Sequence, residues 1–182
     1  MKPNYLTILI TTLCIFFNAC HNSNTAPQLQ LADSLIDKRA DSALCILEKL
    51  SIEEISNKSA KAMYALLLTE ALDKNFKSHR NDSLILIAVD YYKDNSNNKL
   101  KTKAYYLGRV YQDNKEYIKA TEAYLTALKT ASPNQAPILQ IYNNLALCYE
   151  SQEFYLPAIK TYKESYATAE KMQDKYGILH AT

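Results

Sequence analysis

The residues able to carry acid–base, nucleophilic or metal chemistry are few and widely spaced in this sequence. The three histidines are His21, His79 and His180, and no pair of them stands at the spacing that metal ligands use. Cys45 and Cys148 have no histidine close in sequence that could act as a base for a thiolate nucleophile. The pattern therefore predicts no metal site and no catalytic cysteine.

Glycine and acidic residues give no stronger sign of an enzyme. Phosphate-binding loops and dinucleotide motifs need clustered glycines, whereas Gly108 and Gly177 each stand alone. The pair Glu53-Glu54 is more typical of a helix end or a surface than of an acid–base couple. We expect no enzyme and no cofactor. With only 2 glycines and 5 prolines, we also expect helix throughout and almost no backbone with positive φ.

Composition places the chain among soluble globular proteins that bury a core. Hydrophobic residues make up 48% of the 182 residues and charged residues 22%, which fits one folded domain. The net charge is +2, or +1 without Lys2, and gives no electrostatic case for nucleic acid binding. Lys99, Lys101 and Lys103 are more typical of a solvated face than of a phosphate track.

The N-terminus carries a cysteine for which lipidation is expected. Lys2 precedes an apolar run from Tyr5 to Phe17, which is shorter than the ~20 residues that a membrane-spanning helix needs. Small Ala19 then precedes Cys20. This arrangement resembles a bacterial lipoprotein leader, although Phe17 stands where such leaders more often carry leucine. The resemblance implies removal of residues 1–19 and lipidation of Cys20, with palmitate among the acyl chains.

A lipid on Cys20 would anchor the protein stably, because each buried CH₂ contributes about 0.8 kcal/mol. The polar residues up to Pro27 would then form a flexible tether, spanning 20–27. Cleavage with release, or an uncleaved anchor in the inner membrane, are the alternatives. We expect a location in the bacterial cell envelope, lipid-anchored and facing the periplasm, with the outer membrane favoured over the inner one.

The other cysteines should be free thiols. Cys14 leaves with the leader, and Cys45 and Cys148 each lie in an apolar stripe of an expected helix. A buried thiol in such a stripe behaves as a small hydrophobic side chain. A disulfide between the two finds no support in their sequence separation.

A pattern of small and aromatic residues recurs along the chain. One copy consists of Leu107-Gly108, Tyr111, Ala120, Tyr124, Ala127 and Pro133, and a second of Tyr142, Leu145-Ala146, Tyr149, Ala158 and Tyr162. Their spacing resembles the tetratricopeptide repeat (TPR), with Ala104 where that family commonly has tryptophan and an offset of 38 residues instead of 34. Weaker echoes occur upstream, at Tyr64, Leu67-Leu68, Ala71, Ala88 and Tyr92, and at Ala43, Leu47 and Leu50.

This resemblance predicts an all-α fold, a TPR-like α-solenoid of antiparallel helical hairpins over residues 28–182. The best repeats are 101–134 and 139–172. The expected hairpins pair 28–38 with 41–50, 57–73 with 81–94, 100–113 with 116–131, and 136–151 with 154–171. Asp41, Asp82 and Ser132 are expected N-caps.

Packing roles follow from the same pattern. Gly108 and Ala120 should mark the closest approach of their two helices, and Tyr111, Tyr124, Tyr149 and Tyr162 should fill the gaps between units. After the last expected helix, Ile178 and Leu179 look like the start of another first helix. The C-terminal end therefore looks truncated, and a fragment of a longer protein is favoured over an end covered by a partner.

The first helices of such a solenoid line a concave surface that binds peptides or partner domains. Six residues are expected there as a peptide-binding groove: Tyr105, Arg109, Gln112, Gln140, Asn143 and Asn144. Arg109 could grip a carboxylate and the asparagines could hold an extended peptide backbone. The family's clamp for a terminal carboxylate needs a Lys and Asn pair that is not present. Ordinary solvated positions are the alternative.

Two functions remain open beside the disfavoured enzyme. The first is a membrane-anchored scaffold for protein–protein interaction in the envelope, which binds a protein or peptide and no nucleic acid. The second comes from a similarity to exported TPR proteins of the Bacteroides group, some of which continue through a membrane helix to a DNA-binding regulator. This chain would then be the sensory part of a signalling protein, and the coding sequence after Thr182 would distinguish the two.

Two Asp-Ser pairs suggest a second kind of covalent modification. "DSA" at 41–43 and "DSL" at 82–84 resemble acceptors for bacterial O-glycosylation at Ser42 and Ser83. Helix capping by the aspartates is the simpler interpretation.

Overall fold

The computed structural model describes residues 25–79, 81–94, 105–131 and 137–173, and these residues form eight α-helices and no strand. Cys20, Ser132 and residues 178–179 lie outside the described residues. The helices are α2 (Ala26–Leu35), α3 (Ala40–Leu47), α4 (Lys58–Lys74), α5 (Ser83–Tyr92), α7 (Tyr105–Asp113), α8 (Tyr117–Leu128), α9 (Pro137–Ser151) and α10 (Tyr155–Met172).

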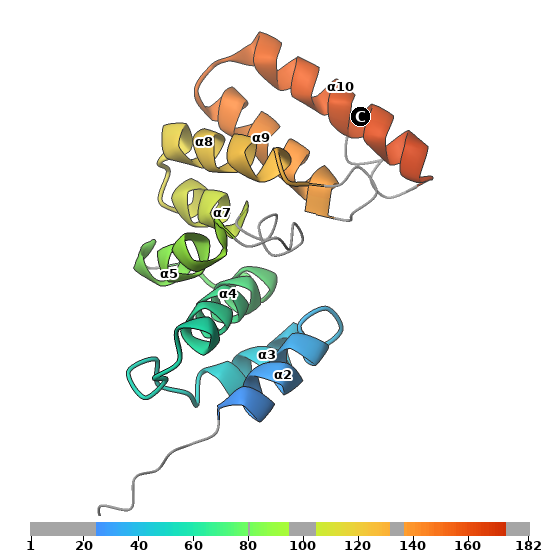
Figure 1. Ribbon diagram of the computed structural model, residues 1–182. Helices are drawn as coiled ribbons and strands as arrows, with labels where there is room; N and C mark the ends of the chain where they lie inside the picture. The colour runs from blue at the N-terminus through green and yellow to red at the C-terminus, as the bar shows by residue number, and fades with distance from the viewer. Residues whose placement is uncertain (1–24, 80, 95–104, 132–136, 174–182) are drawn as a thin grey trace, which may run out of the picture.

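Consecutive helices pair into four antiparallel hairpins, as the sequence predicts. α2 packs on α3, α4 on α5, α7 on α8 and α9 on α10, and further contacts join α3 to α4 and α8 to α9. The hairpins follow one another along the molecule from α2 at one end to α10 at the other (Figure 1). The fold is therefore an all-α, TPR-like helical repeat, and the expected class is confirmed.

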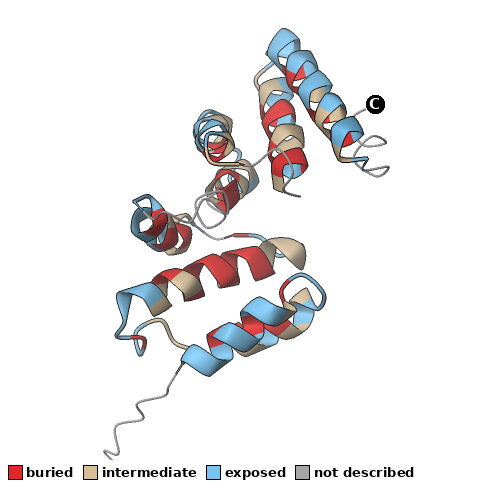
Figure 2. Ribbon diagram, turned by 45° about the vertical axis from the view of Figure 1, so that its right-hand side comes forward, coloured by how far each residue is buried: buried red, intermediate tan, exposed pale blue. Residues whose placement is uncertain are grey.

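The core extends along the stack instead of surrounding one centre. One cluster joins the first hairpin to α4 through residues such as Leu29, Leu47 and Leu67, and a second runs from α4 to α9 through residues such as Tyr106 and Ile141. Each hairpin buries a stripe on the side that faces its neighbours (Figure 2). Burial of these stripes stabilises the stack by about 25 cal/mol for each Å² of apolar surface.

Three hairpin turns share one backbone conformation. Phe76, Lys115 and Glu153 have φ of 54°, 61° and 62°. In each turn this residue donates its N–H to the carbonyl three residues earlier, and the next N–H donates to the carbonyl five residues earlier. This is the Schellman motif, which usually places glycine at the left-handed position. The expectation that scarce glycine leaves almost no positive φ is therefore wrong, because paired backbone hydrogen bonds hold non-glycine residues there.

Small residues and tyrosines pack within the hairpins. Ala120 is fully buried, but the side chain that lies directly over Gly108 is the ring of Tyr124. The Tyr124 hydroxyl donates to Gln112 Oε1 at 2.7 Å and the Tyr162 hydroxyl to Glu150 Oε2 at 3.1 Å, so both tyrosines bridge the two helices of their own hairpin.

One of the predicted N-caps is wrong and one is confirmed. Asp41 is not an N-cap, because α3 begins at Ala40 after Arg39. Asp82 does hold the N-cap position of α5, but the side chain that accepts from Ser83 N–H belongs to Asn81.

The cysteines follow their predictions in part. Cys45 and Cys148 are free thiols and Cys148 is buried, as expected, whereas Cys45 is exposed. Because α3 is short and buries only one face, formed by Ala43, Leu44 and Leu47, Cys45 falls on its outer side.

Candidate binding surface on the first helices

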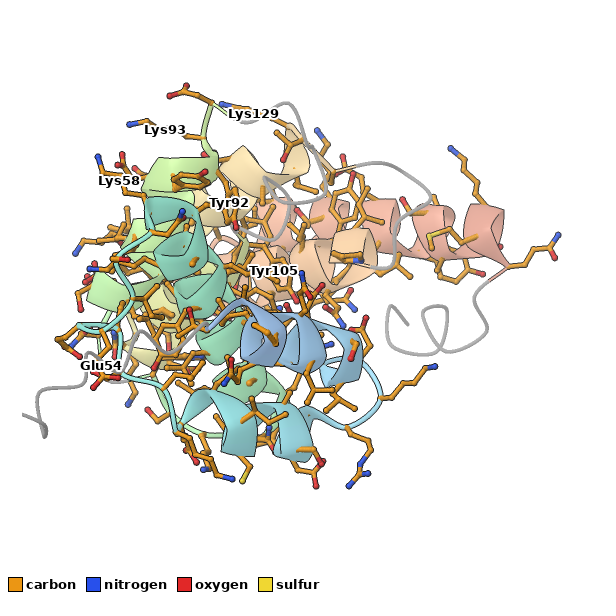
Figure 3. The ribbon with its side chains drawn as sticks, turned by 60° about the horizontal axis from the view of Figure 1, so that its bottom comes forward. Glu54, Lys58, Tyr92, Lys93, Tyr105 and Lys129 are labelled. Atoms are coloured by element: carbon orange, nitrogen blue, oxygen red, sulfur yellow. The ribbon has the colours of Figure 1, made fainter. Side chains whose placement is uncertain are left out.

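Tyr105 begins α7 and links it to α9. Its ring is buried inside the stack (Figure 3), and its hydroxyl donates to Gln140 Oε1 at 3.0 Å. Burial raises the pKa of the Tyr105 phenol, so it remains a neutral hydrogen-bond donor. The contact fixes the position of Gln140, which is itself exposed, at the start of α9.

Arg109 lies one turn further along α7 and is held by the preceding hairpin. Its Nε donates to Asp73 Oδ1 of α4 at 2.8 Å, and Nη1 donates to Gln112 Oε1 at 3.3 Å. Burial acts to lower the pKa of the guanidinium, but Asp73, Tyr124 and Asp113 together outweigh it, so the pKa is raised. Arg109 therefore binds a carboxylate of the chain itself, that of Asp73.

Carboxamide groups lie together on α9. Asn143 Oδ1 accepts from the Ser165 hydroxyl of α10 at 2.7 Å, and Asn144 follows it. Residues 140, 143 and 144 share one helix face because they are spaced i, i+3 and i+4. Within the described ranges, the side-chain amide nitrogens of these three residues donate no hydrogen bond, so each can donate to a ligand.

His79 is a residue of this region that sequence reasoning missed. It lies in the turn between α4 and α5 and is 4% exposed. Nδ1 is 2.7 Å from Asp113 Oδ2 at the end of α7, and Nε2 is 3.2 Å from the carbonyl oxygen of Thr69. The two ring nitrogens thus tie the turn to α7 and to α4. The one available signal was the length of this turn, which exceeds that of the later hairpin turns.

The six predicted groove residues thus divide into two groups. Arg109 and Gln112 belong to a hydrogen-bonded network of α4, α7 and α8, and Tyr105 separately bonds Gln140 of α9. The side-chain amide nitrogens of Gln140, Asn143 and Asn144 donate no hydrogen bond to another described residue. In the part of the chain that the structure describes, no three His, Cys, Asp or Glu side chains cluster as a metal site would need.

Comparison with known families matches residues 101–171 to the tetratricopeptide repeat. The helices over these residues have a tetratricopeptide-like arrangement. The match spans α7 to α10 and covers both of the repeats recognised from tyrosine and alanine spacing. No curated protein and no solved structure gives a significant match. Tetratricopeptide repeats are scaffolds that bind protein partners and are generally not enzymes.

Proposed function

We propose that this protein is a lipid-anchored scaffold of the bacterial cell envelope, which holds a protein or peptide partner against the first helices of its tetratricopeptide repeats. The observation that carries the binding role is the group of three carboxamides on one face of α9. Their amide N–H groups suit the carbonyl oxygens of an extended peptide backbone, and each net hydrogen bond of this kind contributes about 1 kcal/mol. The α7 network beside them holds that face rigid before a ligand arrives.

The charged side chains near this surface favour binding of a ligand's backbone over binding of a ligand's carboxylate. The Arg109 guanidinium already pairs with Asp73, and Lys74 pairs with Glu70 and Asp37. A ligand carboxylate at Arg109 would compete with Asp73, whose side chain is only 17% exposed and would be costly to separate from the guanidinium.

Site-specific photocrosslinking in cells tests the binding surface. A photoreactive residue at Asn144 should capture a partner that the same residue at Thr126, an exposed position on α8, does not capture. Replacing Gln140 and Asn143 by alanine should reduce capture at Asn144, because two side-chain donors to the ligand backbone are lost. Equal capture from Asn144 and Thr126 would contradict the proposed surface.

The anchor is supported by the leader sequence before Cys20 and by the start of α2 at Ala26, only six residues later. In the described ranges, no helix is long and apolar enough to cross a membrane. Growth with an alkyne-labelled palmitate should label the protein. The Cys20→Ala variant should carry no label and should no longer be recovered with the membranes. A label that survives in this variant would rule out Cys20 as the acylated residue.

The regulator alternative rests on the similarity to exported proteins of the Bacteroides group, and the coding sequence after Thr182 decides it. Further repeats followed by a membrane span would favour the regulator. A stop codon followed by unrelated sequence would favour the scaffold.

A further inference from the structure

Leu147 lies in the middle of the exposed face of α9. It follows Asn143 by four residues, Asn144 by three and Gln140 by seven, and side chains at these spacings share one face of a helix. The buried residues of α9 lie on the opposite side. Leu147 is 43% exposed. The three carboxamides therefore flank one exposed leucine.

Leu147 is the apolar exception on this face. Every residue of α9 is described, and its exposed residues are Gln140, Leu147, Glu150 and Ser151. The fold does not require an apolar side chain here, since the equivalent residue of α7, 38 residues earlier, is Arg109. A single exposed leucine is common on protein surfaces. Leu147 differs because it lies beside amide nitrogens that donate no hydrogen bond to another described residue.

This combination matches the two kinds of group that an extended peptide presents. The backbone carbonyl oxygens accept hydrogen bonds from amide donors, and an apolar side chain can be buried against the leucine. Binding hot spots commonly have this form, with an apolar anchor surrounded by polar contacts that exclude water. On α9 the carboxamides would supply the polar contacts and Leu147 the anchor.

The distances along the helix and along a peptide agree. The four residues from Asn143 to Leu147 rise about 6 Å along α9. Alternate residues of an extended chain are about 6.6 Å apart and point to the same side. A peptide whose backbone is bound at Asn143 therefore reaches Leu147 within two residues.

Leu147 also disfavours other side chains at that position of the ligand. A charged or amide side chain would lose water against the leucine without gaining a hydrogen bond from it. Selectivity of this kind comes from the penalty on the wrong ligand as much as from the contact with the right one.

We propose that Leu147 selects peptides that carry an aliphatic or aromatic side chain within two residues of the backbone bound by the α9 carboxamides. This inference rests on the proposed function, because it requires a peptide on α9. It adds the chemical class of the ligand: the carboxamides bind the backbone of any sequence, and Leu147 is the residue that determines specificity.

Selection of a random peptide library, displayed on phage, against the immobilised full chain tests this proposal. Peptides enriched on the parent protein should share an apolar residue at one position. Leu147→Lys should change the preference at that position to Asp or Glu, because the new cation favours a carboxylate. A synthetic copy of a parent-selected peptide should bind Leu147→Lys about tenfold more weakly, a usual effect of losing one apolar contact.

Leu125→Lys is the matched control. Leu125 is 41% exposed on α8, and it lines a groove with Leu156 and Pro157 of α10, away from the exposed face of α9. This variant should select the same peptides as the parent protein. Because both leucines are exposed, both variants should keep the parent's far-ultraviolet circular dichroism spectrum.

Three results would contradict the proposal in different ways. Peptides that lose binding when Gln140 and Asn143 become alanine, but share no apolar position, would overturn the role of Leu147 and leave the binding surface in place. An apolar preference that changes in Leu125→Lys and not in Leu147→Lys would assign the apolar contact to the groove between α8 and α10. A parent protein that enriches no peptide would overturn the proposed peptide-binding function itself, and this inference with it.

Discussion

Gly108 of α7 lies directly under the ring of Tyr124 of α8. A Cβ atom at position 108 would stand 2.6 Å from Cδ1 and 2.8 Å from Cζ of that ring, well inside van der Waals contact. Tyr124 cannot move aside easily, because it is fully buried and its hydroxyl bonds Gln112. The glycine is therefore required by a close approach of helix and ring, although it lies inside a helix, where alanine is intrinsically better.

Gly108→Ala should destabilise the protein by about 1–3 kcal/mol, the usual cost of overpacking a core. Helix propensity alone would favour alanine by about 1 kcal/mol, so the sign of the effect reports the clash. Urea unfolding measures it. Tyr124→Leu removes the ring, and in that background Gly108→Ala should no longer cost stability. If the cost remained the same with leucine, the ring would not be its cause.

Lys115→Gly and Glu153→Gly should each stabilise the protein by about 0.5–1 kcal/mol. A non-glycine residue in the left-handed region costs about 1–2 kcal/mol, which is partly offset by the entropy that glycine loses on folding. Thermal unfolding would show the gain as a higher Tm. Lys129→Gly is the control, because Lys129 has φ of −63°. That change should lower the Tm, and a rise for Lys129→Gly as well would remove the conformational explanation.

Asp73→Ala should destabilise the protein by about 2–4 kcal/mol, because it leaves the Arg109 guanidinium partly buried without its carboxylate. Replacing both residues, Asp73→Leu with Arg109→Met, should cost less than the single change. Asp90→Ala breaks an exposed ion pair with Lys93 and should change the free energy of unfolding by about 0–1 kcal/mol. Similar losses for Asp73→Ala and Asp90→Ala would show that burial does not matter here.

The two thiols should differ in their response to pH. Burial raises the pKa of Cys148 from 9.0 to about 11, so the fold favours the neutral thiol. This contribution to stability is complete below pH 9 and is lost as pH rises from 9 towards 11. In Cys148→Val, the free energy of unfolding should fall less steeply over this range. At pH 8 a thiol reagent should label exposed Cys45 quickly and Cys148 only on unfolding, and rapid labelling of both would contradict the assigned burial.

Periodicity in the sequence was sufficient to predict the helices, their pairing and the repeat. The expected helix at 57–73 lies at Lys58–Lys74, and the expected helix at 154–171 lies at Tyr155–Met172. These features are local, since side chains three and four residues apart share a helix face whatever surrounds them. The spacing of alanine and tyrosine also reflects contacts within one hairpin, as between Gly108 and Tyr124.

Only the tertiary structure decided which partners the polar residues find. Asp73 bonds Arg109, 36 residues later in the sequence, and His79 bonds Asp113, 34 residues later. These pairs form because neighbouring hairpins pack at a particular angle and offset. That angle results from the packing of many side chains together, and no short pattern in the sequence encodes it. The sequence thus determined a helical stack with repeating faces, and the stacking determined which donors are already paired and which face of α9 remains exposed in the described residues.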